Sequence, residues 1–275
     1  MISTDAVDID TGTPEPLYSI RERVAVVTLN RPEARNALSD QLTPALRRMV
    51  KLCADDPAIG ALLITGAGTA FCAGGDVKGM ASRSGQPRSL EERVADLRHK
   101  QRTLTGALAG LRKPTIAALP GPAAGAGLAI ALACDIRIAA ESAFVTTGYV
   151  RIGFSGDYGV NWLLTRAVGS ARAKELMFFS DRIDAARCER IGLVNRVVPD
   201  ESLRHEAFAA ARILANGPAT ALAFIKDNLD DALTVDLATA LDREAERMIA
   251  AGQTGDHKES LRAFAEKRAP KSGPG

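Results

Sequence analysis

Two short apolar segments, each running into a glycine-rich turn, limit the fold of this chain more than any other feature. Residues Ala61–Thr65 (ALLIT) precede the turn GAGT and the segment Ala70–Met80 (AFCAGGDVKGM). Residues Thr115–Leu119 (TIAAL) precede the segment Pro120–Gly127 (PGPAAGAG). Short aliphatic runs bounded by Gly and Pro are typical of buried strands. The sequence therefore predicts two buried strands, each followed by a loop whose small residues let the backbone approach a ligand closely.

Strand and helix patterns alternate around these two segments. Such an alternation indicates βαβ units and a mostly parallel sheet, so the predicted fold class is α/β. The further elements that we expect are a hairpin over Leu17–Asn30, helices over Ser39–Ala54, Leu90–Leu111 and Leu128–Ala133, and strands over Cys134–Ala139 and Leu193–Val198.

The composition changes along the chain predict three parts. Residues 1–15 are polar and acidic, which favours a disordered N-terminal tail. Residues 16–200 carry the strand and helix alternation and form the α/β core. Residues 201–275 show helical periodicity without strands and form a C-terminal helical region.

Composition excludes several classes of function. The net charge of +2 favours neither a nucleic acid nor a membrane as partner. The N-terminus has no apolar signal segment, and no apolar run reaches the length of a membrane span. Four cysteines without a CxxC motif predict reduced thiols and a cytoplasmic location, and three scattered histidines argue against a metal site.

Neither glycine-rich turn matches a nucleotide-binding motif. In the dinucleotide fingerprint GxGxxG, the third glycine would fall on Phe71 after Gly66-Ala-Gly68 and on Ile130 after Gly125-Ala-Gly127. The chain also lacks a GxxxxGK[ST] sequence, so no P-loop is expected.

The two turns can instead act as a pair. The second turn opens a buried helix, whose first N–H groups lack partners and carry partial positive charge. If the N–H groups of Gly75 and Ala126 point at one spot, they form an oxyanion hole, which stabilises developing negative charge. Two separate packing turns are the alternative, and the residues alone leave both possibilities open.

Six motifs occur in one order between residues 17 and 270: NRPEARNAL (Asn30–Leu38), AFCAGGDVKGM (Ala70–Met80), KPTIAALPGPAAGAGLAIALACDIRIAA (Lys113–Ala140), LTRAVG (Leu164–Gly169), GLVNRVVP (Gly192–Pro199) and FAEKRAP (Phe264–Pro270). Together these motifs make the chain resemble the crotonase, or enoyl-CoA hydratase/isomerase, superfamily. The resemblance implies a crotonase (ClpP-like) ββα spiral core and a C-terminal helical trimerisation region. It also implies an acyl-CoA thioester substrate bound without a separate cofactor, and a homotrimer or a hexamer built as a dimer of trimers.

Carried over by position, the resemblance implies an enolate held by the N–H groups of Gly75 and Ala126. Glycine is usual at the position of Ala126, so the extra methyl group narrows the pocket but keeps the donor. Lys267 and Phe264 would reach CoA from a neighbouring subunit. The other implied CoA and substrate contacts are Ala34, Arg35, Ala37, Ala73, Asp76 and Val77.

Both glutamates that hydratases of this family use are missing, because Ala129 and Tyr149 occupy their positions. One acid remains, Asp157, at a position where dienoyl-CoA isomerases, ring-epoxide isomerases and aryl-CoA dehalogenases of the family place an aspartate. One carboxylate beside an enolate can move a proton from one carbon to another, which is double-bond isomerisation. We therefore expect isomerisation or a similar proton transfer by Asp157. Tyr149 either hydrogen-bonds the substrate or lines the pocket.

Five alternatives compete with this interpretation. Asp157 can serve as the cap of a helix beginning near Tyr158. Hydration of an enoyl-CoA is the second candidate reaction, and binding of acyl-CoA without catalysis is a third possibility. RNA binding, known in one relative, would need a lysine-rich helix that is absent here. Dehalogenation would need a histidine where this chain has Arg102.

Overall fold

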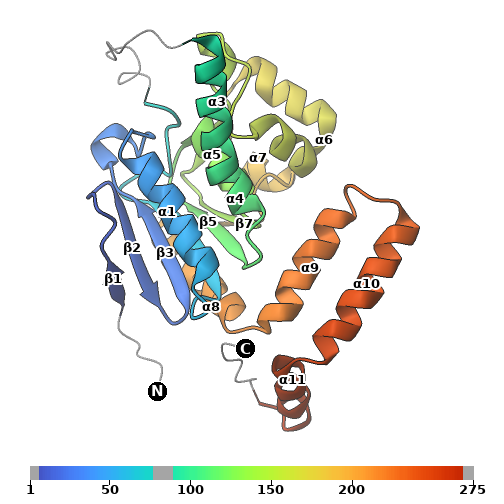
Figure 1. Cartoon of the computed structure of the whole chain (residues 1–275). Coiled ribbons are helices and arrows are strands. Elements are labelled where there is room, and N and C mark those ends of the chain that lie inside the picture. The colour runs from blue at the N-terminus through green and yellow to red at the C-terminus, as the bar shows by residue number, and fades with distance from the viewer. Residues whose placement is uncertain (1–5, 77–88, 269–275) are drawn as a thin grey trace.

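The computed structural model describes residues 6–76 and 89–268, and it has the expected α/β architecture (Figure 1). A central sheet has the order β1-β2-β3-β4-β5-β7-β10. Strands β1 to β3 pair antiparallel, whereas the pairs from β3 to β10 are parallel. The bounds are β1 Val7–Ile9, β2 Pro16–Arg21, β3 Val24–Leu29, β4 Ala61–Gly66, β5 Thr115–Leu119, β7 Ile136–Ala140 and β10 Arg196–Val198.

Strands β4 and β5 are the two apolar segments that the sequence singled out. All five residues of β5 are buried, and five of the six residues of β4 are buried. Complete burial requires cover on both faces of the sheet, as is usual for parallel sheets. The two strands are neighbours in register, with Leu62 opposite Thr115. Because they run parallel, the loops that follow them leave the same edge of the sheet.

The N-terminal segment corrects one prediction. Residues 1–15 were expected to be disordered, but Val7–Ile9 pairs antiparallel with β2, with Val7 opposite Ile20. The Thr11 hydroxyl donates a hydrogen bond to the Pro16 carbonyl at 3.0 Å. A three-residue strand is too short to leave a periodic signal, and its stability comes from the hairpin edge that it covers.

The helices before residue 200 follow the predicted order with shifted bounds. Helix α5 is buried at every residue and begins at Ala126, two residues earlier than predicted. The predicted helix over Leu90–Leu111 is interrupted by a π-helical turn, which joins an α-helix on each side. The bounds are α1 Leu42–Asp55, α3 Leu90–Gln101, the π-helix η2 Arg102–Gly106, α4 Ala107–Ala109, α5 Ala126–Ala133, α6 Val160–Phe179 and α7 Ala185–Arg190, with 3₁₀ turns η1 Pro32–Ala34, η3 Tyr149–Ile152 and η4 Asp200–Ser202.

A small second sheet lies beside the glycine-rich turns. It has the order β6-β8-β9, formed by Ala123–Ala124, Phe144–Thr146 and Ile183–Asp184. An isolated bridge joins Cys72 to Ala123 and so links the two turns directly. At Gly127, a Cβ atom would lie 2.4 Å from the Cys72 carbonyl oxygen, so only glycine allows this contact.

The described residues 201–268 form four α-helices, and the first of them differs from the other three. Helix α8 (Leu203–Ala215) buries four residues and packs against β3, β4, β5 and β7, so its packing assigns it to the core rather than to a separate C-terminal part. Helices α9 (Ala219–Asp231) and α10 (Leu237–Gly252) have no buried residue, and with α11 (Gly255–Ala265) they extend away from the core (Figure 1).

Within residues 6–76 and 89–268, no single helix has the length and apolar character needed to cross a membrane. One sharply bent pair, Asp200–Ala215 with Ala219–Asp231, meets that requirement only when its two members are counted together.

Candidate active site

Three of the predicted catalytic residues line one cavity of about 140 Å³, which we call the Gly75 cavity. Gly75 comes from the loop after β4, and Ala126 begins α5 after β5. Asp157 comes from the loop between η3 and α6. The parallel pairing of β4 and β5 brings the first two together, because ligand sites in such sheets form beyond the carboxyl ends of the strands.

The backbone around Gly75 orients its N–H group. The Leu38 N–H donates to the Gly74 carbonyl at 2.8 Å, and the Asp76 N–H donates to the Leu38 carbonyl at 3.3 Å. Gly75 is therefore bridged to Leu38 in the parallel manner. Successive N–H groups of an extended segment point to opposite sides, so the Gly75 N–H points away from Leu38.

Ala126 presents a second backbone donor next to this segment. It is the first residue of α5, whose N-cap, Gly125, has no side-chain cap. The first N–H groups of a helix have no intrahelical acceptor and lie at the positive end of its dipole. A Cβ atom on Gly74 would lie only 3.5 Å from the Ala126 nitrogen, so the two loops lie side by side.

The structure pairs Asp157 with Tyr149. The Tyr149 hydroxyl donates a hydrogen bond of 2.6 Å to Asp157 Oδ1. Burial raises the pKa of Asp157, and the hydrogen bond from Tyr149 opposes part of that rise. Burial and the nearby carboxylate raise the pKa of Tyr149, so its hydroxyl keeps its proton and remains a donor. A hydrogen-bonded carboxylate that retains some basicity is well suited to moving protons.

This pairing resolves one alternative that the sequence left open. Helix α6 begins at Val160 with Gly159 at its N-cap and no side-chain cap hydrogen bond, so Asp157 does not cap it. The Tyr149 contact itself was not predicted. The two residues lie eight positions apart across an irregular loop, and no periodic pattern relates them.

Neither position of the missing glutamates supplies a carboxylate. Ala129 is fully buried in α5, three residues after Ala126. Tyr149 is also buried, and its hydroxyl is occupied by Asp157. Among the catalytic residues predicted from the sequence, the Gly75 cavity thus combines two backbone segments with one acid, Asp157.

The first predicted CoA-binding motif lies against the loop after β4. The Ala73 N–H donates to the Arg35 carbonyl at 2.9 Å, and the Arg31 guanidinium pairs with Asp76 at 3.3 Å. The Asn36 side chain connects the same segments, accepting from the Arg31 N–H at 2.8 Å and donating to the Ala70 carbonyl at 2.8 Å. This structural role of Asn36 was not predicted.

The structure places the predicted CoA contacts in two groups. Ala34, Arg35 and Ala37 lie in or just after η1, beside Ala73 and Asp76. Phe264, which is 85% exposed, and Lys267 lie at the C-terminal end of α11, and neither lines the Gly75 cavity. Val77 lies outside the described residues.

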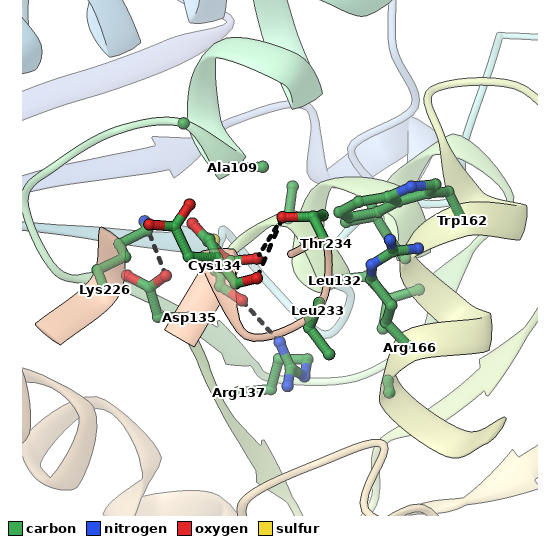
Figure 2. A pocket seen from close by; sticks show the side chains of 16 residues that line it. Ala109, Leu132, Cys134, Asp135, Arg137, Trp162, Arg166, Lys226, Leu233 and Thr234 are labelled. Atoms are coloured by element: carbon green, nitrogen blue, oxygen red, sulfur yellow. Dashed lines mark hydrogen bonds and ion pairs between the residues drawn. The ribbon is translucent and has the colours of Figure 1, made fainter. Parts of the chain in front are cut away.

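A larger cavity, of about 510 Å³, contains none of the predicted site residues (Figure 2). It lies where the end of α9 meets α4, α5 and α6. Its charged groups are partly engaged with one another, since Lys226 pairs with Asp135 at 2.7 Å. The Arg166 guanidinium lies over the Trp162 ring. Across residues 6–76 and 89–268, no group of three or more His, Cys, Asp or Glu residues is arranged to hold a metal ion.

Comparison with known proteins identifies the family of the chain. The model of the enoyl-CoA hydratase/isomerase family matches residues 19–273. The chain is 38% identical over 249 residues to the "Probable enoyl-CoA hydratase echA8" of Mycobacterium tuberculosis (strain CDC 1551 / Oshkosh), covering 90% of this chain and 94% of the relative. It is 37% identical over 255 residues to the 1,2-epoxyphenylacetyl-CoA isomerase of Escherichia coli (strain K12), covering 92% and 96%.

Solved structures show the same likeness. A crystal structure of an enoyl-CoA hydratase from Polaromonas sp. JS666 aligns with a TM-score of 0.85 at 32% identity and covers 93% of this chain and 98% of its own. This likeness confirms the predicted crotonase fold. By sequence and by structure, the chain belongs to the enoyl-CoA hydratase/isomerase family.

Proposed function

We propose that this protein moves a double bond within an acyl-CoA thioester, with Asp157 as the group that carries the proton. The observation that supports this function most is the position of Asp157. Its carboxylate accepts a hydrogen bond from Tyr149, and it lines the same cavity as Gly75 and Ala126. Asp40 also lines this cavity but is engaged in another interaction. With Asp157 as the one acid assigned to the reaction beside two backbone donors, the site suits proton transfer within an enolate better than addition of water.

The two backbone N–H groups would bind the thioester oxygen. When a proton leaves the carbon next to the thioester, negative charge develops on that oxygen. The N–H groups of Gly75 and Ala126, the second at the positive end of α5, would stabilise this charge without having to move.

Asp157 would act first as a base and then as an acid. Its carboxylate takes a proton from C2 of a 3-enoyl-CoA, which breaks the C2–H bond and gives a dienolate. The protonated carboxyl then returns the proton to C4, so the double bond moves from C3–C4 to C2–C3. The Tyr149 hydroxyl donates its hydrogen bond to Asp157 Oδ1. The other carboxylate oxygen of Asp157 is therefore left for the substrate.

Hydration of a 2-enoyl-CoA is the second candidate, and the hydratase name of the M. tuberculosis relative favours it. Hydration calls for one group to activate water and another to protonate the α-carbon. At the two positions where hydratases of the family carry glutamates, this chain has Ala129 and Tyr149, and the Tyr149 hydroxyl is hydrogen-bonded to Asp157. Binding without catalysis is the third candidate.

The reactions can be separated with the wild-type protein. We expect 3-hexenoyl-CoA to be isomerised at least about 100-fold faster than crotonyl-CoA is hydrated, since an acid–base group contributes roughly 10²–10⁴ in rate. Ultraviolet absorbance and chromatography of the products measure both rates. If hydration is faster than isomerisation, hydration replaces isomerisation as the favoured reaction. Tight binding of both thioesters without turnover would favour the third candidate, binding without catalysis.

Tyr149→Phe is expected to shift the acid limb of the pH profile of kcat/KM to higher pH. Asp157 must be ionised to act as a base, and the hydrogen bond from Tyr149 lowers its pKa. Losing a hydrogen bond to a charged group should move the limb by about one pH unit. Tyr18→Phe removes a buried hydroxyl that has no hydrogen-bond partner within the described part of the chain and serves as the control. An unshifted limb in Tyr149→Phe would contradict this role.

We also propose that the protein assembles as a homotrimer or a dimer of trimers through α9, α10 and α11. These helices leave large apolar side chains exposed, including Leu229, Met248 and Phe264. In such an assembly, Phe264 and Lys267 would reach CoA bound to a neighbouring subunit. No separate cofactor is needed for the proposed proton transfer.

A further inference from the structure

The peptide group between Asp157 and Tyr158 is held on both of its sides. Its N–H, on Tyr158, donates a hydrogen bond of 2.6 Å to Gln101 Oε1. Its carbonyl, on Asp157, accepts a hydrogen bond from the Val160 N–H at 3.1 Å. Rotation of this peptide group would break both hydrogen bonds, so together they fix its plane. Because the plane is attached to the Cα atom of Asp157, it also fixes the backbone from which the carboxylate extends.

The backbone at Tyr158 needs such support. Its φ angle is +50°, a left-handed conformation that bulky residues rarely adopt. The Tyr158 side chain is buried and lines the Gly75 cavity beside Asp157. Residues in such conformations cost free energy and persist only where the surrounding structure maintains them, which is common at active sites. The hydrogen bond to Gln101 is one of the contacts that maintain this conformation.

Gln101 reaches this loop from the point where its helix enters the core. It is the last residue of α3, a helix without a buried residue. The π-helical turn η2 follows directly, buries Leu104 and Thr105, and packs against α1 and α5. Single π-helical turns within α-helices are frequent at functional sites. Gln101 does not line the Gly75 cavity, so it can affect a reaction there only through the residues that it holds.

We propose that Gln101 is a positioning residue for Asp157, and that it acts through the N–H of Tyr158. The hydrogen bond from Tyr149 fixes one oxygen of the Asp157 carboxylate, and Gln101 fixes the backbone that carries it. A misplacement of about 1 Å at a reacting group can cost roughly 10²-fold in rate. This inference rests on the proposed function, because it takes Asp157 to be the acid–base group.

Gln101→Leu tests the contact without any turnover. Leucine forms helices as readily as glutamine does, but its side chain cannot accept a hydrogen bond. Amide hydrogen exchange in residues 154–162, followed by mass spectrometry, should become about 2- to 10-fold faster, as expected for the loss of one hydrogen bond. Gln101→Glu keeps an acceptor oxygen at the same reach and should retain the wild-type exchange rate. Unchanged exchange in Gln101→Leu would overturn the inference.

The same two variants test the effect on catalysis. We expect Gln101→Leu to lower kcat by roughly 10- to 100-fold, while the Kd for hexanoyl-CoA changes by less than about threefold. Gln101→Glu, measured at a pH where Asp157 is ionised, should keep kcat close to that of the wild-type protein. If Gln101 had only a structural role, Gln101→Leu would lower the thermal stability and leave kcat of the folded protein unaltered, and that result would also overturn the inference.

Gln41→Leu is the matched control. It makes the same substitution at a glutamine that accepts an exposed hydrogen bond from the Thr13 hydroxyl at 3.0 Å, and it should retain the wild-type exchange rate and kcat. Asp157→Asn separates the two ways of failing. If Asp157→Asn is inactive while Gln101→Leu has wild-type kcat, only the role of Gln101 is wrong. If Asp157→Asn turns over normally, the proposed function is wrong, and the role of Gln101 in it is wrong as well.

Discussion

Asp157→Asn is expected to lower kcat for isomerisation of 3-hexenoyl-CoA by about 10³-fold while changing the Kd for acyl-CoA by less than threefold. An amide cannot take the proton from C2, and removal of an acid–base group typically costs roughly 10²–10⁴ in rate. The amide keeps nearly the same volume and can still accept the hydrogen bond that Tyr149 now donates to the carboxylate. Steady-state kinetics and calorimetry on the same preparation would separate the two effects.

Asp181→Asn is the control for this variant. Asp181 has 70% of its side chain exposed and pairs with Arg151 on the surface, so the same chemical change there should leave kcat unaltered. Wild-type turnover by Asp157→Asn would rule out Asp157 as the acid–base group and shift attention to hydration or to binding without catalysis.

Ala126→Pro is expected to lower kcat by about 10²- to 10³-fold with the fold retained. Proline at the first position of a helix fits the helical geometry and removes only an N–H that has no intrahelical acceptor. In the proposed mechanism that N–H is one of two donors to the enolate oxygen, and loss of one such donor costs roughly 10²–10³ in kcat. Circular dichroism and thermal unfolding would confirm that α5 is still formed.

Ala126→Gly is the matched control, because glycine keeps the backbone N–H and removes only the methyl group. We expect this variant to retain turnover close to that of the wild-type protein. If the proline variant is folded and as active as the glycine variant, the Ala126 N–H does not stabilise the enolate.

The parts of the fold that could be predicted have strong local patterns. β4 and β5 were predictable because a strand buried on both faces needs a continuous apolar run, and α5 because it is apolar on every side. β1 was not predictable, since its three residues form a strand only through pairing with β2. The division between α8 and the projecting helices also escaped prediction, because helical periodicity does not tell which partner an apolar face will meet.

The site shows the same difference between local and tertiary information. Gly75, Ala126 and Asp157 could be named from motifs, and the structure brings them to one cavity. The Tyr149 contact depends on a loop with several residues in left-handed conformations, among them Gly153 and Tyr158.

The most direct test of this account is a crystal structure of the wild-type protein with a saturated acyl-CoA bound. The account predicts that the thioester oxygen lies within hydrogen-bonding distance of both the Gly75 and Ala126 nitrogen atoms, about 2.7–3.1 Å. It also predicts that the free oxygen of the Asp157 carboxyl group faces C2 and C4 of the acyl chain. A thioester bound away from these two nitrogen atoms, or an Asp157 side chain turned away from the acyl chain, would contradict it.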